Sequence, residues 1–284
     1  MRSSREGQLL NELGGQPDWP RAASSSNEQR AARGWRPLAP TAQTPPPERA
    51  DTAVSERKAW RTAIRGVIVD FGGVLALPPS SEALARLQMI SGFDDADAFL
   101  SCWQRHRRSY DLGQVSADEY WRLVGAEVER KYDGAALAQL LVEDATCWSM
   151  QNAAMVAWLE ELKAAGLRLA LLSNIPREQW ATLKEGLAWL SLCDVVVVSY
   201  ELRIAKPDPE IYRRCLEQLS LAPDEILFVD DQPDNIAAAT ALGMNALLFT
   251  TVDEFRSGLA NFDGIPLPPA SAGAWARSKT TRMS

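Results

Sequence analysis

Five short apolar runs between residues 66 and 249 constrain the fold of this chain more than any other feature. Each is nearly continuous in apolar side chains, and most are bounded by polar or turn residues. The runs are 66–70 (GVIVD), 167–172 (LRLALL), 195–198 (VVVV), 226–229 (ILFV) and 246–249 (ALLF). Runs of this length and composition are typical of strands that are covered on both faces, as in a parallel sheet.

Helical segments separate these predicted strands. Residues 153–165 have helical periodicity and end at Gly166, and the alanine-rich segment 236–242 ends at Gly243. Glycine directly after the last periodic residue is a common helix stop. Because strands and helices alternate, we expect parallel βαβ units and an α/β fold with an open, doubly wound, Rossmann-like parallel sheet.

One stretch interrupts the alternation. Residues 79–151 have helical periodicity and no strand signal, and Ser116 and Glu119 have the spacing of a capping box that begins a helix. We therefore expect an all-helical cap at 79–151, inserted into an α/β core made of 61–78 and 152–264. Residues 1–60, rich in Ser, Arg, Gly and Pro, predict a disordered tail, and residues 265–284 predict a flexible one.

Composition and charge narrow the class of partner and the compartment. Hydrophobic residues make up 46% of the chain, enough for a sizeable core, and the net charge of −7 argues against a nucleic-acid partner. The four cysteines form no CxxC or Cys/His metal pattern, so we expect free thiols. No apolar stretch could cross a bilayer and no signal peptide precedes the fold, which predicts a cytoplasmic protein with no membrane contact.

Polar residues stand where the predicted strands end. In open α/β sheets, ligands bind at the carboxyl ends of the strands, so these residues are the candidate site. They are Asp70 after the first strand, Ser173 and Asn174 after the second, Lys206 after the third, and Asp230 and Asp231 after the fourth. Alone, each could be a helix cap, a turn residue or a solvated loop lysine. Their joint placement at four successive strand ends favours a site.

The residue types suit phosphoryl transfer. A carboxylate such as Asp70 can attack phosphorus, and Asp70 together with Asp231 can hold Mg²⁺, which prefers oxygen ligands. Ser173 and Asn174 offer neutral donors for phosphoryl oxygens. Lys206 supplies positive charge against the clustered acids and the transferred group.

Four motifs resemble those of the haloacid dehalogenase superfamily of hydrolases. They are DFGGVL at 70–75, LLSN at 171–174, KPDPEIY at 206–212 and FVDDQPDNIAAA at 228–239. The resemblance covers roughly residues 64–252, and the insertion between the first two motifs is similar to the helical cap of subfamily I. It implies a fold with a Rossmann-like core, Mg²⁺ as cofactor and a small phosphorylated metabolite as substrate.

The resemblance also implies roles, residue by residue. Asp70 would be the nucleophile and a metal ligand, with the Gly72 carbonyl and Asp231 as further metal ligands. Ser173 and the Asn174 backbone would hold phosphate, and Lys206 would orient the nucleophile and the phosphate. Asp230 and Asn235 would contact these groups rather than the metal.

The first motif departs from the family's usual pattern at two positions. Gly72 stands where a second aspartate normally acts as general acid, a group worth ~10² to 10⁴ in rate, and Val74 replaces a threonine. The D-x-G-x-V pattern resembles phosphatases of the glucose-1-phosphate type. His106, the only histidine, is a candidate acid in the cap, although a packing or surface role is the simpler interpretation. Arg105, Arg107 and Arg108 could bind an anionic group of the substrate or form a solvated charge run.

Three functions remain open at this point. The leading one is a Mg²⁺-dependent phosphatase that acts through an aspartyl-phosphate. A metal-independent haloacid dehalogenase also lacks the second aspartate, but it has little use for the pair Asp230 and Asp231. A regulatory or interaction protein that retains the metal and phosphate site would explain the missing acid. The residues specify neither the substrate nor the oligomeric state.

Overall fold

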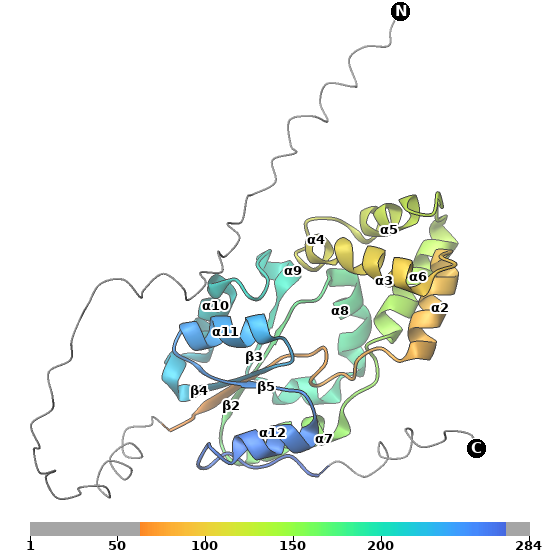
Figure 1. Ribbon diagram of the computed structural model, residues 1–284. Coiled ribbons are helices and arrows are strands. Elements are labelled where there is room, and N and C mark those ends of the chain that lie inside the picture. The colour runs from red at the N-terminus through yellow and green to blue at the C-terminus, as the bar shows by residue number, and fades with distance from the viewer. Residues whose placement is uncertain (1–62, 271–284) are drawn as a thin grey trace, which may run out of the picture. The chain divides into compact units, whose positions relative to one another are not determined.

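The five predicted strands form one wholly parallel sheet. The computed structural model describes residues 63–270, and its sheet has the strand order β3-β2-β1-β4-β5 (Figure 1). The strands are β1 (Gly66–Val69), β2 (Arg168–Ser173), β3 (Val195–Val198), β4 (Ile226–Asp230) and β5 (Asn245–Leu248). This confirms the predicted α/β fold. The edge strand β5 lies one residue earlier than predicted, and it is only partly buried.

Helices cover both faces of the sheet, as a doubly wound fold requires. They are α7 (Ala153–Ala164), α8 (Arg177–Leu183), α9 (Ser199–Leu202), α10 (Pro209–Leu219), α11 (Pro233–Ala241) and α12 (Val252–Leu259), with short 3₁₀ turns η1 (Lys184–Gly186), η2 (Ala188–Leu192) and η3 (Pro223–Glu225). Val67 and Val69 of β1 point to the face under α7, α8 and α12. Ile68 points to the opposite face, under α10 and α11 (Figure 1). Side chains alternate across a strand, so an uninterrupted apolar run fills two cores at once.

Strand register brings the candidate residues to one edge. Val69, the last residue of β1, pairs with Leu171 of β2 and Val229 of β4, so the segments that follow these strands leave the sheet side by side. The chain runs from β1 outward through β2 and β3, then returns to the other side of β1 to form β4 and β5. Such a reversal opens a crevice at the strands' carboxyl ends.

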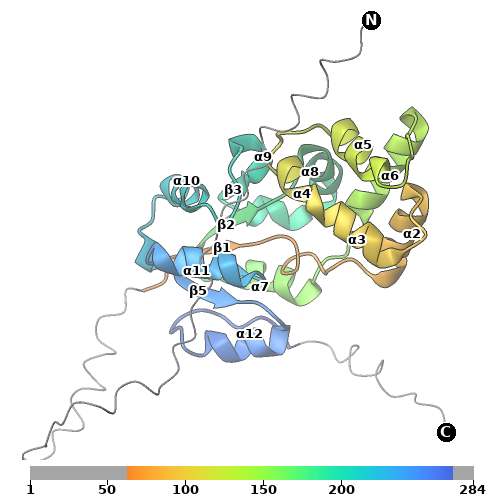
Figure 2. The same ribbon diagram turned by 45° about the horizontal axis from the view of Figure 1, so that its top comes forward.

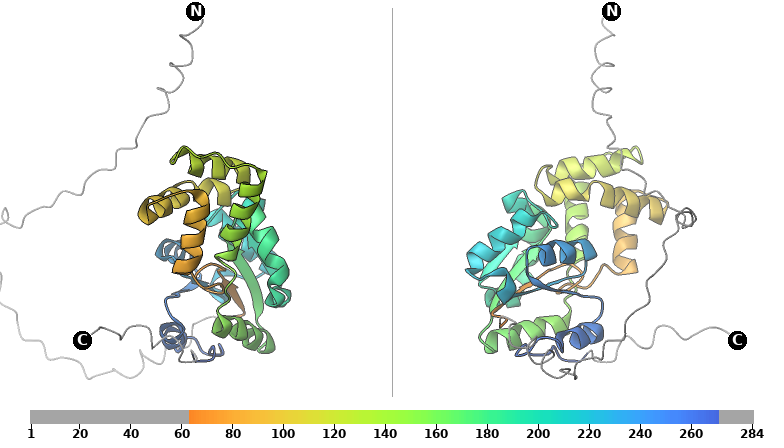
Figure 3. Two further views of the ribbon diagram at one scale, coloured as in Figure 1. Left: turned by 90° about the vertical axis from the view of Figure 1, so that its right-hand side faces the viewer. Right: turned by 60° about the vertical axis from the view of Figure 1, so that its left-hand side comes forward.

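The insertion after β1 is helical throughout, as predicted. Its helices are α2 (Ser81–Ser91), α3 (Ala96–Arg105), α4 (Arg107–Asp111), α5 (Ala117–Ala126) and α6 (Gly134–Thr146), which form a group of their own at one end of the sheet (Figures 2 and 3). The Ser116 hydroxyl accepts a hydrogen bond from the Glu119 N–H at 3.2 Å, which confirms the predicted start of α5. A separate aromatic core fills this cap, and in it Tyr110 stacks on Tyr120 with centroids 4.5 Å apart.

The carboxyl-terminal boundary lies beyond the predicted one. Ile265, assigned from the sequence to the tail, is buried against the core, and the Trp158 indole N–H donates to the Pro266 carbonyl at 2.7 Å. The predicted tail at 1–60 and most of the one after 265 lie outside the described residues. All four cysteines are free thiols, as expected. Within 63–270, no helix combines the length and the apolar character that a bilayer span requires.

Candidate active site

A cavity of about 270 Å³ lies where the core meets the cap. The strand ends contribute Asp70, Gly72, Ser173, Asn174, Lys206, Asp231 and Asn235 to its lining, and the insertion contributes Trp103, Gln104, Arg107, Asp111 and Trp148. Four segments far apart in the sequence therefore meet in one place, as their positions at the strand ends predict. Asp230 lies beneath the lining and contacts it through Lys206.

Lys206 is the centre of the core side of the cavity. Its side chain is 1% exposed, and its Nζ lies 2.8 Å from Asp70 Oδ1 and 2.6 Å from Asp230 Oδ2. Burial alone would lower the pKa of Lys206, but the charges of the two carboxylates outweigh it and raise the pKa. The lysine is therefore a fixed positive charge within hydrogen-bond distance of the candidate nucleophile.

Asp70 follows β1 and is almost fully buried. Its Oδ1 accepts hydrogen bonds from Lys206 and, at 2.7 Å, from the Phe71 N–H. Burial raises the pKa of Asp70 to about 7, with Lys206 opposing the shift and the charge of Asp230 adding to it. A cation bound beside this carboxylate would favour its ionised form.

Both carboxylate oxygens of Asp230 already accept hydrogen bonds from the protein. Its Oδ1 accepts from the Gln232 N–H and from Asn235 Nδ2, both at 2.9 Å, while its Oδ2 is bound by Lys206. The group is completely buried. Asp230 therefore fixes Lys206 and Asn235 in place, and the other acid of the pair is left for a ligand.

Asp231 is the more exposed acid of the pair, and it lines the cavity. Burial and the neighbouring charge of Asp230 raise the pKa of Asp231. Gly73 makes room for it: φ at this glycine is +77°, and a Cβ there would lie 2.4 Å from Asp231 Oδ2. Carboxylate oxygens of Asp70, Asp230 and Asp231 lie within 4.8 Å of one another. A cluster of hard oxygen donors at this spacing, with its anionic charge concentrated in a buried place, fits Mg²⁺.

The two residues after β2 differ in what they can offer a ligand. Ser173 is buried and lines the cavity. The Asn174 amide is occupied by the main chain of Lys206: its Oδ1 accepts from the Lys206 N–H at 2.9 Å, and its Nδ2 donates to the Lys206 carbonyl at 3.0 Å. The Asn174 side chain therefore positions the lysine loop, a role that its place after a strand did not predict.

An indole ring occupies the space beside Gly72. A Cβ on Gly72 would lie 3.1 Å from the Trp148 ring, which also lines the cavity. His106, the candidate replacement for the missing acid, does not line the cavity. Its ring nitrogen lies instead near the Cys102 thiol and the Glu127 carboxylate in the cap. The position of His106 is therefore wrong for a general acid at this site.

The arginine run divides into two kinds of residue. Arg105 and Arg108 are exposed, and Arg105 pairs with Glu127, so these two form the solvated charge run. Arg107 is largely buried. Its Nε donates to Asp111 at 2.9 Å, its Nη1 to Asp144 at 3.0 Å, and its Nη2 to Gln179. Burial lowers the pKa of Arg107, but Asp144 and Asp111 outweigh this effect and raise the pKa.

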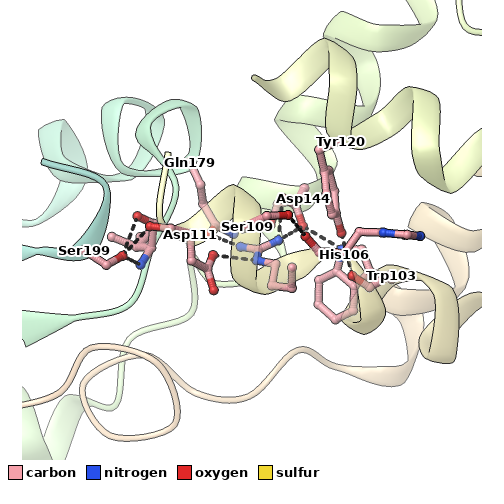
Figure 4. Close-up of polar contacts among 10 residues, drawn as sticks. Trp103, His106, Ser109, Asp111, Tyr120, Asp144, Gln179 and Ser199 are labelled. Carbon is pink, nitrogen blue, oxygen red and sulfur yellow. Dashed lines mark hydrogen bonds and ion pairs between the residues drawn. The ribbon is translucent and has the colours of Figure 1, made fainter. Parts of the chain in front are cut away.

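The Arg107 network joins the cap to the core. Gln179 belongs to α8 of the core, and its Nε2 donates to the Asp144 carbonyl of α6 at 3.0 Å (Figure 4). Ser199, the first residue of α9, donates from its hydroxyl to the Asp111 carbonyl at 2.5 Å. The sequence analysis missed Asp144 and Gln179. Asp144 lies in the last turn of helix 134–146 next to Glu143, and the sequence alone does not distinguish the buried acid from its neighbour.

Comparison with known proteins agrees with this architecture. Residues 64–243 match the family model of haloacid dehalogenase-like hydrolases. A sesquiterpene phosphatase from Aspergillus oryzae is 27% identical over 190 residues, 66% of this chain and 91% of that protein. An (S)-2-haloacid dehalogenase from Pseudomonas sp. is 33% identical over 200 residues, 67% of this chain and 86% of that protein. Two other relatives are longer proteins, of which the match spans 19% and 37%.

A solved structure has the same fold. It is a HAD family enzyme from Bacteroides thetaiotaomicron in complex with magnesium and inorganic phosphate, with a TM-score of 0.56 and 19% identity. The likeness covers 66% of this chain and 95% of that one.

Proposed function

The chain belongs to the haloacid dehalogenase-like hydrolases, and from this premise we propose that it is a Mg²⁺-dependent phosphatase that hydrolyses phosphate monoesters of small metabolites through an aspartyl-phosphate on Asp70. The observation that carries the proposal is the contact of Lys206 with both Asp70 and Asp230 in a cavity that Asp231 also lines. Phosphatases among the relatives and a magnesium and phosphate complex of a family member support it.

Asp70 acts as the nucleophile in this proposal. Lys206 and the Phe71 N–H both bind Oδ1, which leaves Oδ2 to attack phosphorus. The Asp70–phosphorus bond of an acyl phosphate forms as the bond from phosphorus to the substrate oxygen breaks, and the departing alkoxide takes a proton from solvent water. Water then hydrolyses the acyl phosphate, which restores the carboxylate and releases phosphate.

The other polar residues hold the phosphate and the metal. Asp70, Asp231 and the Gly72 carbonyl are the proposed Mg²⁺ ligands, and the ion, when bound, supplies charge that offsets the phosphoryl oxygens. Ser173 and the Asn174 main chain bind those oxygens. Asp230 and Asn235 keep Lys206 and the strand-end loop in position through their hydrogen bonds.

Phosphate release from a panel of phosphorylated metabolites tests the proposal. We expect turnover that requires Mg²⁺ and that falls at least ~10³-fold in Asp70→Asn, because removal of a nucleophile leaves only the residual catalysis of the rest of the site. Asp224→Asn, at an acid far from the cavity, is the matched control and should retain activity. Phosphate release that persists undiminished in Asp70→Asn would exclude the aspartyl-phosphate route.

Dehalogenation is the second candidate, favoured by Gly72 and by the 33% identical dehalogenase relative. In that reaction Asp70 would attack carbon and expel halide without a metal. Halide release from 2-haloacids in the presence of a chelator would establish it. A regulatory protein that binds Mg²⁺ without turnover is distinguished by a rise in melting temperature with Mg²⁺ and no release of either product.

A further inference from the structure

We infer that the phosphate monoester is that of an uncharged alcohol, which packs on Trp103 and Trp148, and that the cavity rejects substrates with a second anionic group. The inference rests on the proposed function and concerns the part of the substrate that leaves. It follows from the charged and aromatic side chains on the cap side of the cavity. The proposed phosphoryl transfer does not use these side chains.

The cavity has no cation to spare for a second anion. Among the described residues that line it, Lys206 and Arg107 are the positively charged ones. Lys206 is bound by Asp70 and Asp230 and faces the transferred phosphoryl group. Every nitrogen of the Arg107 guanidinium already donates to a protein oxygen, on Asp111, Asp144 or Gln179.

The carboxylates around Arg107 exceed its charge. Asp111 lines the cavity, and Asp144, which is 2% exposed, lies behind Arg107. One guanidinium therefore faces two carboxylates. A phosphate or carboxylate on the leaving group would be desolvated next to Asp111 without a partner, and an unpaired buried anion is strongly unfavourable.

Apart from Gln104, indole rings supply the uncharged part of the cap-side surface. Trp103 is held by its Nε1, which donates to Asp144 at 3.1 Å, and its ring stacks on Phe99. The Trp148 ring lies beside Gly72 and also lines the cavity. An aromatic face packs against the C–H groups of a polyol or against a hydrocarbon chain, and both belong to uncharged alcohols. The cavity volume of about 270 Å³ limits the alcohol to a small one.

Pairs of substrates that differ by one anionic group test the inference. We would measure kcat/KM with Mg²⁺ for a hexose monophosphate against the hexose bisphosphate, for glycerol phosphate against phosphoglycerate, and for a short isoprenyl phosphate. In each pair, we expect kcat/KM to be about 10-fold or more higher for the substrate whose leaving alcohol is uncharged. This is the discrimination that one desolvated charge can provide. The isoprenyl arm separates a hydrocarbon from a polyol.

The outcomes separate the two proposals. Equal or faster hydrolysis of the members with a second anionic group, with turnover otherwise normal, would overturn the inference alone. No release of phosphate from any substrate would overturn the proposed function, and the inference with it.

Gln104→Arg tests the same point from the protein side. Gln104 is exposed on α3 and lines the cavity, so an arginine there adds an uncommitted cation without removing a core contact. We expect it to shift the kcat/KM ratio toward the substrates with a second anionic group by about 10-fold, the worth of one charge-assisted contact. Gln139→Arg, at an exposed position of α6 outside the cavity, is the matched control. An unchanged ratio in Gln104→Arg, or an equal shift in both variants, would contradict the inference.

Discussion

Lys206 in the core and Arg107 in the cap are both buried cations that lie between two carboxylates, and both line the same cavity. Their surroundings differ in whether a neighbouring carboxylate keeps an oxygen that the cation does not bind. Lys206 contacts one oxygen of Asp70, and the other oxygen remains for chemistry. Arg107 is surrounded by Asp111, Asp144 and Gln179, which belong to three different helices or their ends.

The difference distinguishes the ion pair that we propose to be catalytic from one that joins two parts of the fold. Burial and perturbed pKa values occur in both places, so neither property alone identifies a site. A functional pair keeps a reactive atom unsatisfied. In the Arg107 network, each guanidinium nitrogen already donates to a protein oxygen. The network connects the cap to α8 and to Ser199 at the start of α9.

Lys206→Met should produce the largest effect. It removes the positive charge beside Asp70 and leaves the fully buried Asp230 without its cation, so we expect kcat to fall by ~10³-fold or more. Loss of one partner of a buried ion pair also costs about 3–5 kcal/mol of stability. Phosphate release and urea unfolding, each with saturating Mg²⁺, measure the two effects. Retained turnover would remove Lys206 from the mechanism.

Arg107→Met should have a comparable effect on stability and a much smaller one on catalysis. Asp144 would lose its cation inside the cap, again at a cost of about 3–5 kcal/mol. In the proposed mechanism the chemistry depends on core residues, so we expect kcat to change by less than ~10-fold in the fraction that stays folded, and any further loss of activity to come from a higher KM. If Arg107→Met lowered kcat as far as Lys206→Met, the distinction between the two cations would be wrong.

Strand patterns predicted the core side of the cavity because a parallel sheet gathers its strand ends at one edge. Asp70, Ser173 and Asp231 lie where apolar runs stop, and Lys206 lies in the connection that follows the third run. No side-chain detail was needed to group them. Asn174 is the exception, since its amide binds the Lys206 main chain 32 positions away.

The cap side could not be predicted in the same way. Helical periodicity marks an apolar stripe, but it does not say how a helix is turned toward a second domain. Arg107 meets Asp144 across 37 positions and Gln179 across 72, and these contacts depend on how α4, α6 and α8 pack. The run Arg105–Arg108 therefore gave no indication that its third residue is buried.

The pH dependence of stability should differ between the core side and the cap side of the cavity, because Mg²⁺ is expected to bind Asp70 and not Asp111. Without metal, the pKa of Asp70 is raised from 3.8 to about 7 and that of Asp111 to about 6, in both cases chiefly by burial. The native state then keeps protons that the unfolded chain has lost. The contribution of these two carboxyls to the free energy of unfolding is fully present below about pH 4. It is lost as the pH rises through about 6 for Asp111 and through about 7 for Asp70.

Bound Mg²⁺ should abolish the fall in stability that comes from Asp70 as the pH rises, and it should leave the fall that comes from Asp111. Because the ion must displace the proton of Asp70, its affinity should rise by up to ~10-fold per pH unit below pH 7 and level off above it. Melting curves between pH 5 and 8 at several Mg²⁺ concentrations measure both quantities. A Mg²⁺ affinity independent of pH in this range would contradict the assignment of Asp70 as a ligand.

Two helix caps give the smallest and most closely matched comparison. Ser116 caps α5 in the cap, and Asp208 caps α10 in the core, where its carboxylate accepts from the Glu210 N–H at 2.9 Å. Replacing either by alanine should cost about 1 kcal/mol of stability, since each loses one N-cap hydrogen bond. Their effects on catalysis should differ because Asp208 is two residues from Lys206. We expect a several-fold drop in kcat for Asp208→Ala and none for Ser116→Ala, measured as phosphate release at a temperature where both are folded. Equal kcat values in the two variants would mean that Asn174 and Asp230 hold Lys206 in place without help from the start of α10.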